Sequence, residues 1–233
     1  MPRLPRISPA GISIHIMQRG NNRQACFVSE EDHWAYIGWL KEYSSKYRVD
    51  MHAWVIMTNH VHLLCTPHDD VGVSKMMQAI GRRYVQYFNR EYRRSGTLWE
   101  GRFKSCLVES EAYLLELYRY IEMNPVRAKM VNDPGEYHWS SYQVNGLGKV
   151  SELCTPNQEY LSLGGDPFER QNNYRELFVH QVDGALLKEI RDNTHKGMAI
   201  GSERFKDEIE TLTGRRLKSK KRGRRLGWRK KDS

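Results

Sequence analysis

Residues 51–66, MHAWVIMTNHVHLLCT, form the stretch of sequence that decides the fold. Met51–Met57 has the composition of a strand, and His60–Thr66 has that of a second strand. Between them, Thr58 and Asn59 have the composition of a two-residue turn. Because so short a connection joins strands that run in opposite directions, the stretch predicts an antiparallel hairpin.

The second strand of this hairpin carries His60 and His62. Alternate residues of a strand point to the same face, so the two imidazoles are expected to emerge side by side. Two nitrogen ligands on one rigid strand make half of a divalent-metal site. The alternative is a pair of partly exposed histidines at a sheet edge, since the chain contains nine histidines.

Strand and helix patterns alternate on both sides of the hairpin. Upstream are a strand at 12–17, a basic turn at 19–23 and a helix from Ser29 to about Tyr47. Downstream are a helix from about 73 to 95, a strand region at 98–108 and helices at about 110–123 and 124–130. This order predicts an α+β fold in which helices pack mainly on one face of an antiparallel sheet.

The predicted helix at 110–123 has two different faces. Its apolar stripe has the spacing i, i+3, i+4, i+7 and consists of Leu114, Leu117, Tyr118 and Ile121. Tyr120 lies about 200° around the axis from Tyr118, on a more polar face with Glu116 and Asn124 one turn away. A hydroxyl and an amide oxygen on that face could meet the histidine pair. Alternatively, Asn124 caps the next helix, and Glu116 forms a solvated salt bridge.

Several motifs occur in a recognisable order. A strand-borne His-hydrophobic-His is followed about sixty residues later by a helical Tyr, and four residues after that by an amide side chain. The accompanying motifs are QRGNNR at 18–23, WVIMTNHVH at 54–62, LWEGRF at 98–103, YRYIEMNPVR at 118–127 and WSSY at 139–142. Over residues 8–145 the chain resembles the IS200/IS605-type single-tyrosine HUH transposases, and most closely the REP-associated tyrosine transposases.

This resemblance implies a set of site residues and an activity. Carried over by position, it makes His60, His62 and Asn124 ligands of Mg²⁺ or Mn²⁺ and Tyr120 the nucleophile. It implies an HUH-nuclease core, similar to the RNA-recognition fold, that cleaves and rejoins single-stranded or hairpin (REP-type) DNA through a 5′-phosphotyrosine. The third ligand is usually Gln in the transposases proper, and Asn resembles the REP-associated branch. Ligand chemistry alone leaves Zn²⁺ or Ni²⁺ open.

Two other functions fit the same residues. The first is a non-catalytic protein on the same fold that binds nucleic acid by sequence or hairpin shape. It predicts that Tyr120→Phe leaves every DNA-related activity intact. The second is a metal hydrolase that uses His60 and His62 with a bound water, which would release free 5′-phosphate ends and never trap protein on DNA.

Basic and aromatic side chains around the predicted sheet are candidate DNA contacts. They are Arg19, Arg23, Trp99, Arg102 and Lys104, although each also fits an ordinary surface or core position. The C-terminal run RRLKSKKRGRR adds candidate phosphate contacts at Arg215, Arg216, Lys220, Lys221 and Arg222. The alternative is a tail that serves solubility alone.

Charge is distributed unevenly along the 233 residues. The net charge of the chain is +9, and its last nineteen residues alone carry about that much, whereas residues 131–214 are acidic. We therefore expect three parts: a catalytic domain at 1–144, an acidic and mainly helical appendage at 145–214, and a basic, disordered tail at 215–233.

Composition narrows the cellular context. A hydrophobic content of 39% excludes wholesale disorder, and no apolar run approaches the roughly 20 residues that cross a bilayer. The N-terminus lacks the apolar segment of a secretion signal. The four cysteines form no C-x-x-C pair, so neither a disulfide framework nor a zinc ribbon is expected. These features predict a cytoplasmic protein, and the resemblance implies that it binds DNA, is associated with the nucleoid and is a monomer or a homodimer.

Overall fold

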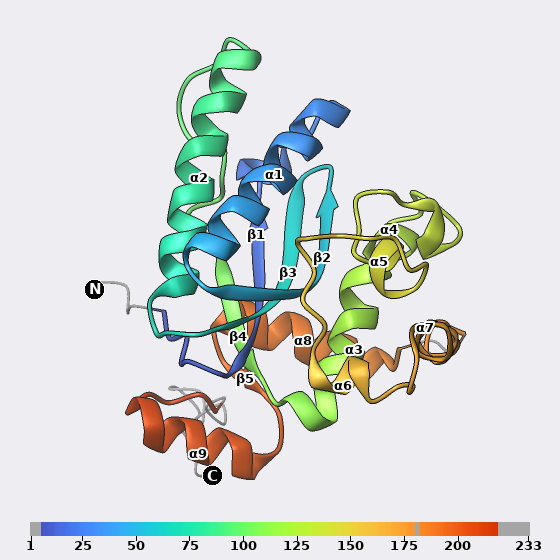
Figure 1. Ribbon diagram of the computed structural model, residues 1–233. Helices are drawn as coiled ribbons and strands as arrows, with labels where there is room; N and C mark the ends of the chain where they lie inside the picture. Colours follow the sequence, from blue (N-terminus) through green and yellow to red (C-terminus); the bar gives the residue numbers. More distant parts are fainter. Residues whose placement is uncertain (1–5, 180–181, 219–233) are drawn as a thin grey trace, which may run out of the picture.

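A five-stranded sheet forms the centre of the computed structural model, which describes residues 6–179 and 182–218 (Figure 1). The strand order is β2-β3-β1-β4-β5. The strands are β1 (Ser13–Arg19), β2 (Val49–Met57), β3 (His60–Pro67), β4 (Lys104–Val108) and β5 (Ala199–Ile200). The first four pair antiparallel, but β5 runs parallel to β4. The sheet is therefore mixed, which corrects the prediction of an antiparallel sheet.

The hairpin at 51–66 forms as the sequence predicts. Thr58-Asn59 joins β2 to β3, and Met57 lies opposite His60. β1 pairs with the other edge of β3, which places Arg19 opposite His60 and Met17 opposite His62. The histidine strand is therefore the second strand of the sheet and is held on both sides.

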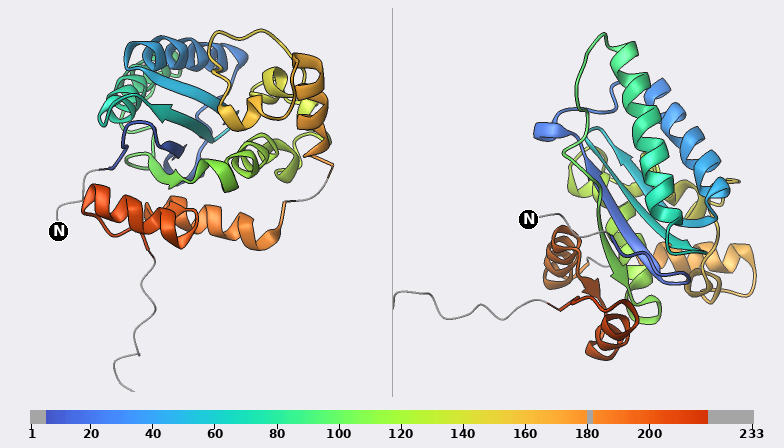
Figure 2. Two further views of the ribbon diagram at one scale, coloured as in Figure 1. Left: turned by 60° about the horizontal axis from the view of Figure 1, so that its bottom comes forward. Right: turned by 90° about the vertical axis from the view of Figure 1, so that its left-hand side faces the viewer.

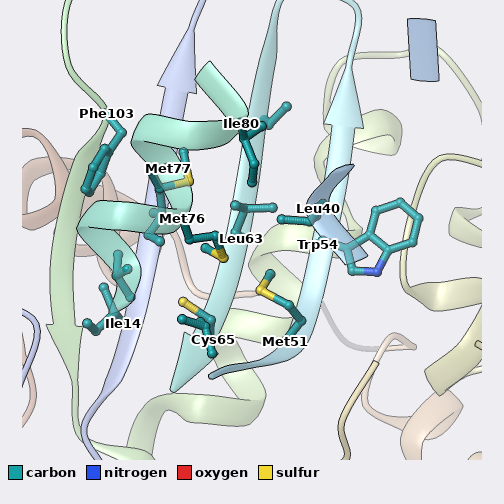
Figure 3. Packing of buried hydrophobic residues seen from close by; sticks show 14 of the residues in the cluster. Ile14, Leu40, Met51, Trp54, Leu63, Cys65, Met76, Met77, Ile80 and Phe103 are labelled. Carbon is teal, nitrogen blue, oxygen red and sulfur yellow. The ribbon is translucent and has the colours of Figure 1, made fainter. Parts of the chain in front are cut away.

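Helices cover both faces of the sheet (Figure 2). α1 (Glu30–Lys46) and α2 (Gly72–Glu91) pack on the face that carries Ile14 and Leu63, and Figure 3 shows this core. α3 (Ser110–Glu122) and α8 (Gly184–Lys196) pack on the face that carries Leu64. The α+β class is confirmed, but the expected one-sided packing is wrong. β2 and β3 are buried along most of their length, and strands buried on both faces need cover on both sides.

Shorter elements connect and surround these layers. They are the 3₁₀ helices η1 (Asn21–Arg23) and η2 (Pro134–Glu136), and the helices α4 (Asn124–Arg127), α5 (Tyr142–Asn145), α6 (Gln158–Leu161), α7 (Pro167–Glu176) and α9 (Glu203–Thr213). Cys26, Cys65, Cys106 and Cys154 are free thiols, and the first three are buried. None of the helices in the described part of the chain is both long and apolar enough to span a membrane.

Residues 145–214 are mainly helical, as predicted, and part of this region packs on the sheet. α8 packs against β4 and β1, and β5 extends the sheet beyond β4. The start of the predicted tail is also ordered: Leu217 is 1% exposed, and Lys218 pairs with Glu203 and Asp207 of α9. Two acidic side chains of α9 therefore bind Lys218, near the start of the basic run. Residues 219–233 lie outside the described residues.

A buried carboxylate ties α3 to the segments that follow it. Glu122 is fully buried and accepts hydrogen bonds from the Ser141 hydroxyl (2.5 Å), the Asn145 amide (2.9 Å) and the Tyr174 hydroxyl (2.6 Å). These three donors come from the loop before α5, from α5 itself and from α7. One side chain thus joins the C-terminal end of α3 to three later segments.

We expect Glu122→Ala to destabilise the protein by about 3–5 kcal/mol, because three buried donors would lose their acceptor and a cavity would form. The measurement is chemical denaturation of the full chain. Glu122→Gln keeps one acceptor oxygen and should cost clearly less. A loss below about 1 kcal/mol for Glu122→Ala would show that water or other acceptors replace the carboxylate.

Candidate active site

His60 and His62 stand side by side on β3, on the face that α3 covers. Their ring centroids are 5.1 Å apart. The Nδ1 atom of His60 lies 2.6 Å from Asn59 Oδ1, and the Nδ1 atom of His62 lies 2.8 Å from Nε2 of His15. The Nε2 atom is therefore the one left to each ring for another ligand.

Burial keeps these imidazoles neutral. It lowers the pKa of His60 to about 4 and the pKa of His62 well below its usual range, with the neighbouring positive charges adding to both effects. His15 is fully buried, and burial lowers its pKa to about 3. Neutral imidazole is the form of histidine that binds metals.

A chain of hydrogen bonds fixes the tautomer of His62. The Thr194 hydroxyl of α8 donates to the Ile190 carbonyl (2.7 Å), so its oxygen accepts from Nδ1–H of His15 at 2.9 Å. His15 Nε2 then carries no proton and accepts from Nδ1–H of His62. This network leaves a lone pair on Nε2 of His62.

His60 is oriented by a similar contact. The Asn59 amide donates through Nδ2 to the Arg23 carbonyl (3.1 Å), so its Oδ1 faces His60 and accepts from Nδ1–H. His60 therefore also presents an unprotonated Nε2. Two neutral, oriented imidazoles fit a divalent cation, although the described residues contain no cluster of three or more His, Cys, Asp or Glu side chains that could hold one.

Asn124 lies where α3 gives way to α4, one turn after Tyr120. Its Nδ2 donates to the carbonyl oxygens of Tyr120 (3.0 Å) and Ile121 (3.1 Å), which leaves Oδ1 as the free acceptor. Its side chain does not cap α4, since these bonds point back to α3. An amide oxygen is a suitable third donor for a cation bound by two imidazoles.

Tyr120 faces the histidines from α3. Its ring lies edge-on to His62 (5.6 Å between centroids) and to His15 (5.7 Å). The Arg127 guanidinium lies over the ring at 4.7 Å from its centroid, and the Arg191 side chain of α8 lies close enough to the Tyr120 side chain to act on its pKa. Burial raises the pKa of Tyr120, and both arginines act in the opposite direction.

Tyr118 lies in a different environment, as the helical stripe predicts. It is fully buried, and its ring packs against Tyr160 and Tyr174, away from the histidines. Among the described residues, Glu116 forms no hydrogen bond with the Tyr120 hydroxyl. Its carboxylate instead holds the Arg119 guanidinium with two bonds of 2.9 Å, which is the salt-bridge alternative.

The predicted DNA contacts lie in several different environments. Trp99 is a correction: it is 5% exposed, and its ring packs in the core against Tyr84 and Phe27, so it offers no face to a base. Arg19 is bound by Glu100 at 2.6 Å, and Lys104 donates to Nδ1 of His195 at 2.8 Å. Both basic side chains are therefore engaged by other side chains of the protein.

The remaining basic candidates are more accessible. Arg23, Arg102 and Arg216 are exposed, and Arg215 is half-buried. Arg216 donates through Nε to the Lys218 carbonyl at 3.2 Å. Lys220, Lys221 and Arg222 lie outside the described residues.

The sequence analysis missed the contribution of His15, Thr194 and Arg191. A signal for His15 was present, because in ISIHIM it alternates with Ile14 and Ile16 and so shares the face of His62. Thr194 and Arg191 lie three residues apart on α8, far from the motifs in sequence. Both reach the candidate site only because α8 packs on this face of the sheet.

The sheet therefore carries a strand with paired histidines, covered by a helix that presents a tyrosine to His62, as the resemblance in sequence implies. Residues 9–124 match the family model described as "Transposase IS200 like". Through this segment, which runs from before β1 to Asn124, the chain belongs to the IS200-like transposase family. α8 lies outside the matched segment.

Two solved structures are similar to this chain. The structure of a REP-associated tyrosine transposase bound to a REP hairpin is 16% identical, with a TM-score of 0.51 over 67% of this chain and 93% of that one. A candidate transposase from Deinococcus radiodurans R1 is 22% identical, with a TM-score of 0.36 over 52% of this chain and 96% of that one. No curated protein matches the chain. The first structure supports the fold.

A prediction follows from the His15 contact. We expect His15→Leu to weaken Mn²⁺ binding about 10- to 100-fold, because His62 would lose the partner that orients its ring and fixes its tautomer. Isothermal titration of the full chain with Mn²⁺ measures this. His68→Leu removes a histidine that pairs with Asp50 outside the site and should change nothing. Equal Mn²⁺ affinity in the two variants would contradict the role of His15.

Proposed function

We propose that this protein is a metal-dependent single-stranded DNA endonuclease and strand transferase of the REP-associated type. It acts at hairpin DNA through a covalent 5′-phosphotyrosine. The observation that carries the proposal is that Tyr120 of α3 faces His62, the neighbour of His60 on β3, with the positive charges of Arg127 and Arg191 beside its side chain. The transposase family and the similar REP-associated structure support it.

The proposed reaction transfers a phosphoryl group to Tyr120. The phenolic oxygen attacks the scissile phosphorus, and the bond from phosphorus to the 3′ oxygen breaks. The proton lost by the Tyr120 hydroxyl balances the one gained by the leaving 3′ oxygen. The products are a 5′-phosphotyrosine and a free 3′-OH, which can later attack the same linkage and rejoin a strand. Arg191 and Arg127 hold positive charge beside the reacting oxygen.

His60, His62 and Asn124 would hold a divalent cation, Mg²⁺ or Mn²⁺, next to Tyr120. When bound, such an ion neutralises charge on the non-bridging phosphate oxygens. The hydrogen bonds to both Nδ1 atoms and to the Asn124 amide orient the three donors before any ion arrives. Arg23 and Arg102, both exposed, remain candidate phosphate contacts.

The test is trapping of the protein on DNA. The full chain is incubated with a DNA hairpin that carries a single-stranded flank, with and without Mg²⁺, and resolved in SDS. We expect a divalent-ion-dependent adduct that retains a label placed on the 3′ side of the nick, in the fragment joined to Tyr120 through its 5′ phosphate, while the fragment on the 5′ side is released with a free 3′-OH. Free 5′-phosphate ends without an adduct would favour the metal hydrolase, and binding without cleavage would favour the non-catalytic alternative.

A further inference from the structure

We propose that a basic groove beside α2, on the sheet face opposite Tyr120, binds nucleic acid that leads into the active site. The inference rests on the proposed function and extends it to a second surface. The groove is a cavity of about 640 Å³, and we call it the α2 groove. Its walls include Arg6, Gln18, Lys75, Arg82, Arg102 and Phe103.

Four cations from three segments surround this groove. Lys75 and Arg82 are exposed and lie seven residues apart on α2, so they share one face of the helix. Arg102 comes from the loop before β4, and Arg6 from the N-terminal segment. Within residues 6–179 and 182–218, Lys75, Arg82 and Arg102 form no ion pair with an acidic side chain. One acidic residue, Asp70, lines the groove, and its carboxylate accepts from the Ala10 backbone N–H at 2.9 Å.

A buried amide in the groove lacks a partner. Gln18 is 8% exposed, and its Oε1 accepts no hydrogen bond from the described residues. Buried polar atoms are nearly always paired, so an unpaired carbonyl oxygen on a residue that lines a cavity supports a ligand there. Phosphate oxygens only accept hydrogen bonds, whereas base edges also donate them. Nucleic acid has both an anionic backbone for the cations and N–H donors for Gln18, which a free phosphate lacks.

The groove lies at the same end of the sheet as His60. Gln18 lies opposite Val61 on β3, and the next residue, Arg19, lies opposite His60. Because successive strand residues point to opposite faces, Gln18 faces α2 and Arg19 faces the histidine side. Figure 3 shows Met76 and Met77 of α2 over the sheet and Phe103 beside them at the β4 side. A nucleic-acid strand that passes around residues 99–103 can therefore contact both faces of the sheet.

α2 itself supplies a matched control. Arg83 follows Arg82 directly, but its guanidinium binds Glu42 (2.8 Å) and the Tyr43 hydroxyl (3.0 Å) of α1 and lies over the Trp39 ring. Arg90 is exposed further along the same helix and does not line the groove. Removal of Arg83 and Arg90 changes the net charge as much as removal of Lys75 and Arg82 does.

The experiment compares Lys75→Gln/Arg82→Gln with Arg83→Gln/Arg90→Gln in the full chain. Fluorescence anisotropy over a series of salt concentrations gives Kd for a DNA hairpin with a single-stranded flank, and for the stem and the flank alone. We expect the groove variant to bind at least about tenfold more weakly, with a log–log salt slope smaller by about 2, and the control to stay within about twofold. If affinity falls for the stem alone or for the flank alone, that part of the DNA is the part that binds in the groove.

Gln18→Met provides a second, uncharged variant. We expect about fivefold weaker binding with an unchanged salt slope, since Gln18 contacts bases and not phosphates. If both double variants lost DNA affinity equally, or if neither lost affinity, the proposal that the α2 groove binds nucleic acid would be refuted. The adduct assay separates the two proposals. If the adduct forms but Lys75→Gln/Arg82→Gln does not selectively weaken binding, only the groove proposal is refuted. If that variant selectively weakens binding but no adduct forms, the proposed chemistry is refuted.

Discussion

Tyr120→Phe is expected to abolish the covalent adduct, with a loss of at least about a thousandfold in its rate of formation. The change removes one oxygen atom, the one that we propose forms the bond to phosphorus. The ring would keep its edge-on contacts with His15 and His62 and the Arg127 guanidinium above it, so the site should stay folded. DNA affinity, measured by anisotropy at equilibrium, should change by less than about threefold.

Tyr118→Phe is the matched control, because it removes the same atom two residues away on the same helix. Tyr118 packs against Tyr160 and Tyr174, on the side of α3 away from the histidines. The Tyr118→Phe variant should form the covalent adduct at nearly the normal rate at saturating DNA. An adduct that persists in Tyr120→Phe, or that is lost only in Tyr118→Phe, would refute the assignment of the nucleophile.

Local periodicity explains how much of this arrangement could be predicted from the sequence. A strand period of two places His60 and His62 on one face, and a helical period of 3.6 separates Tyr120 from Tyr118. Both rules act within a few residues, and the structure agrees with both. The two-residue turn fixes the hairpin for the same reason. The assignment of roles to these residues remains a prediction until the adduct is tested.

Long-range packing explains what the sequence left open. Trp99 looked like a stacking residue because a tryptophan beside basic residues suits DNA, yet its ring completes a core with Tyr84 and Phe27. The polar residues of α8 gave no motif, and only the parallel β5 and the packing of α8 on β4 bring them to the site. Similarly, Arg82 and Arg83 are indistinguishable in sequence, but one lines the α2 groove and the other binds α1.

The position of α8 outside the matched family segment makes its arginine a sharp test of the site. We expect Arg191→Met to slow adduct formation about a hundredfold at saturating DNA, a magnitude typical of the loss of one charged donor beside developing negative charge. Arg191 is exposed, so its loss should cost little stability, and its contact with the Tyr120 side chain is the interaction that disappears. The measurement is a single-turnover rate together with an equilibrium Kd.

Lys188→Met is the control, since it removes one positive charge from the exposed surface of the same helix, three residues before Arg191. A general electrostatic effect on DNA would raise Kd in both variants and would disappear at saturating DNA. An effect on the reacting oxygen would instead lower the rate in Arg191→Met alone. Equal rates in both variants would show that α8 supports the sheet without taking part in the chemistry, and the functional site would then be contained within the family segment.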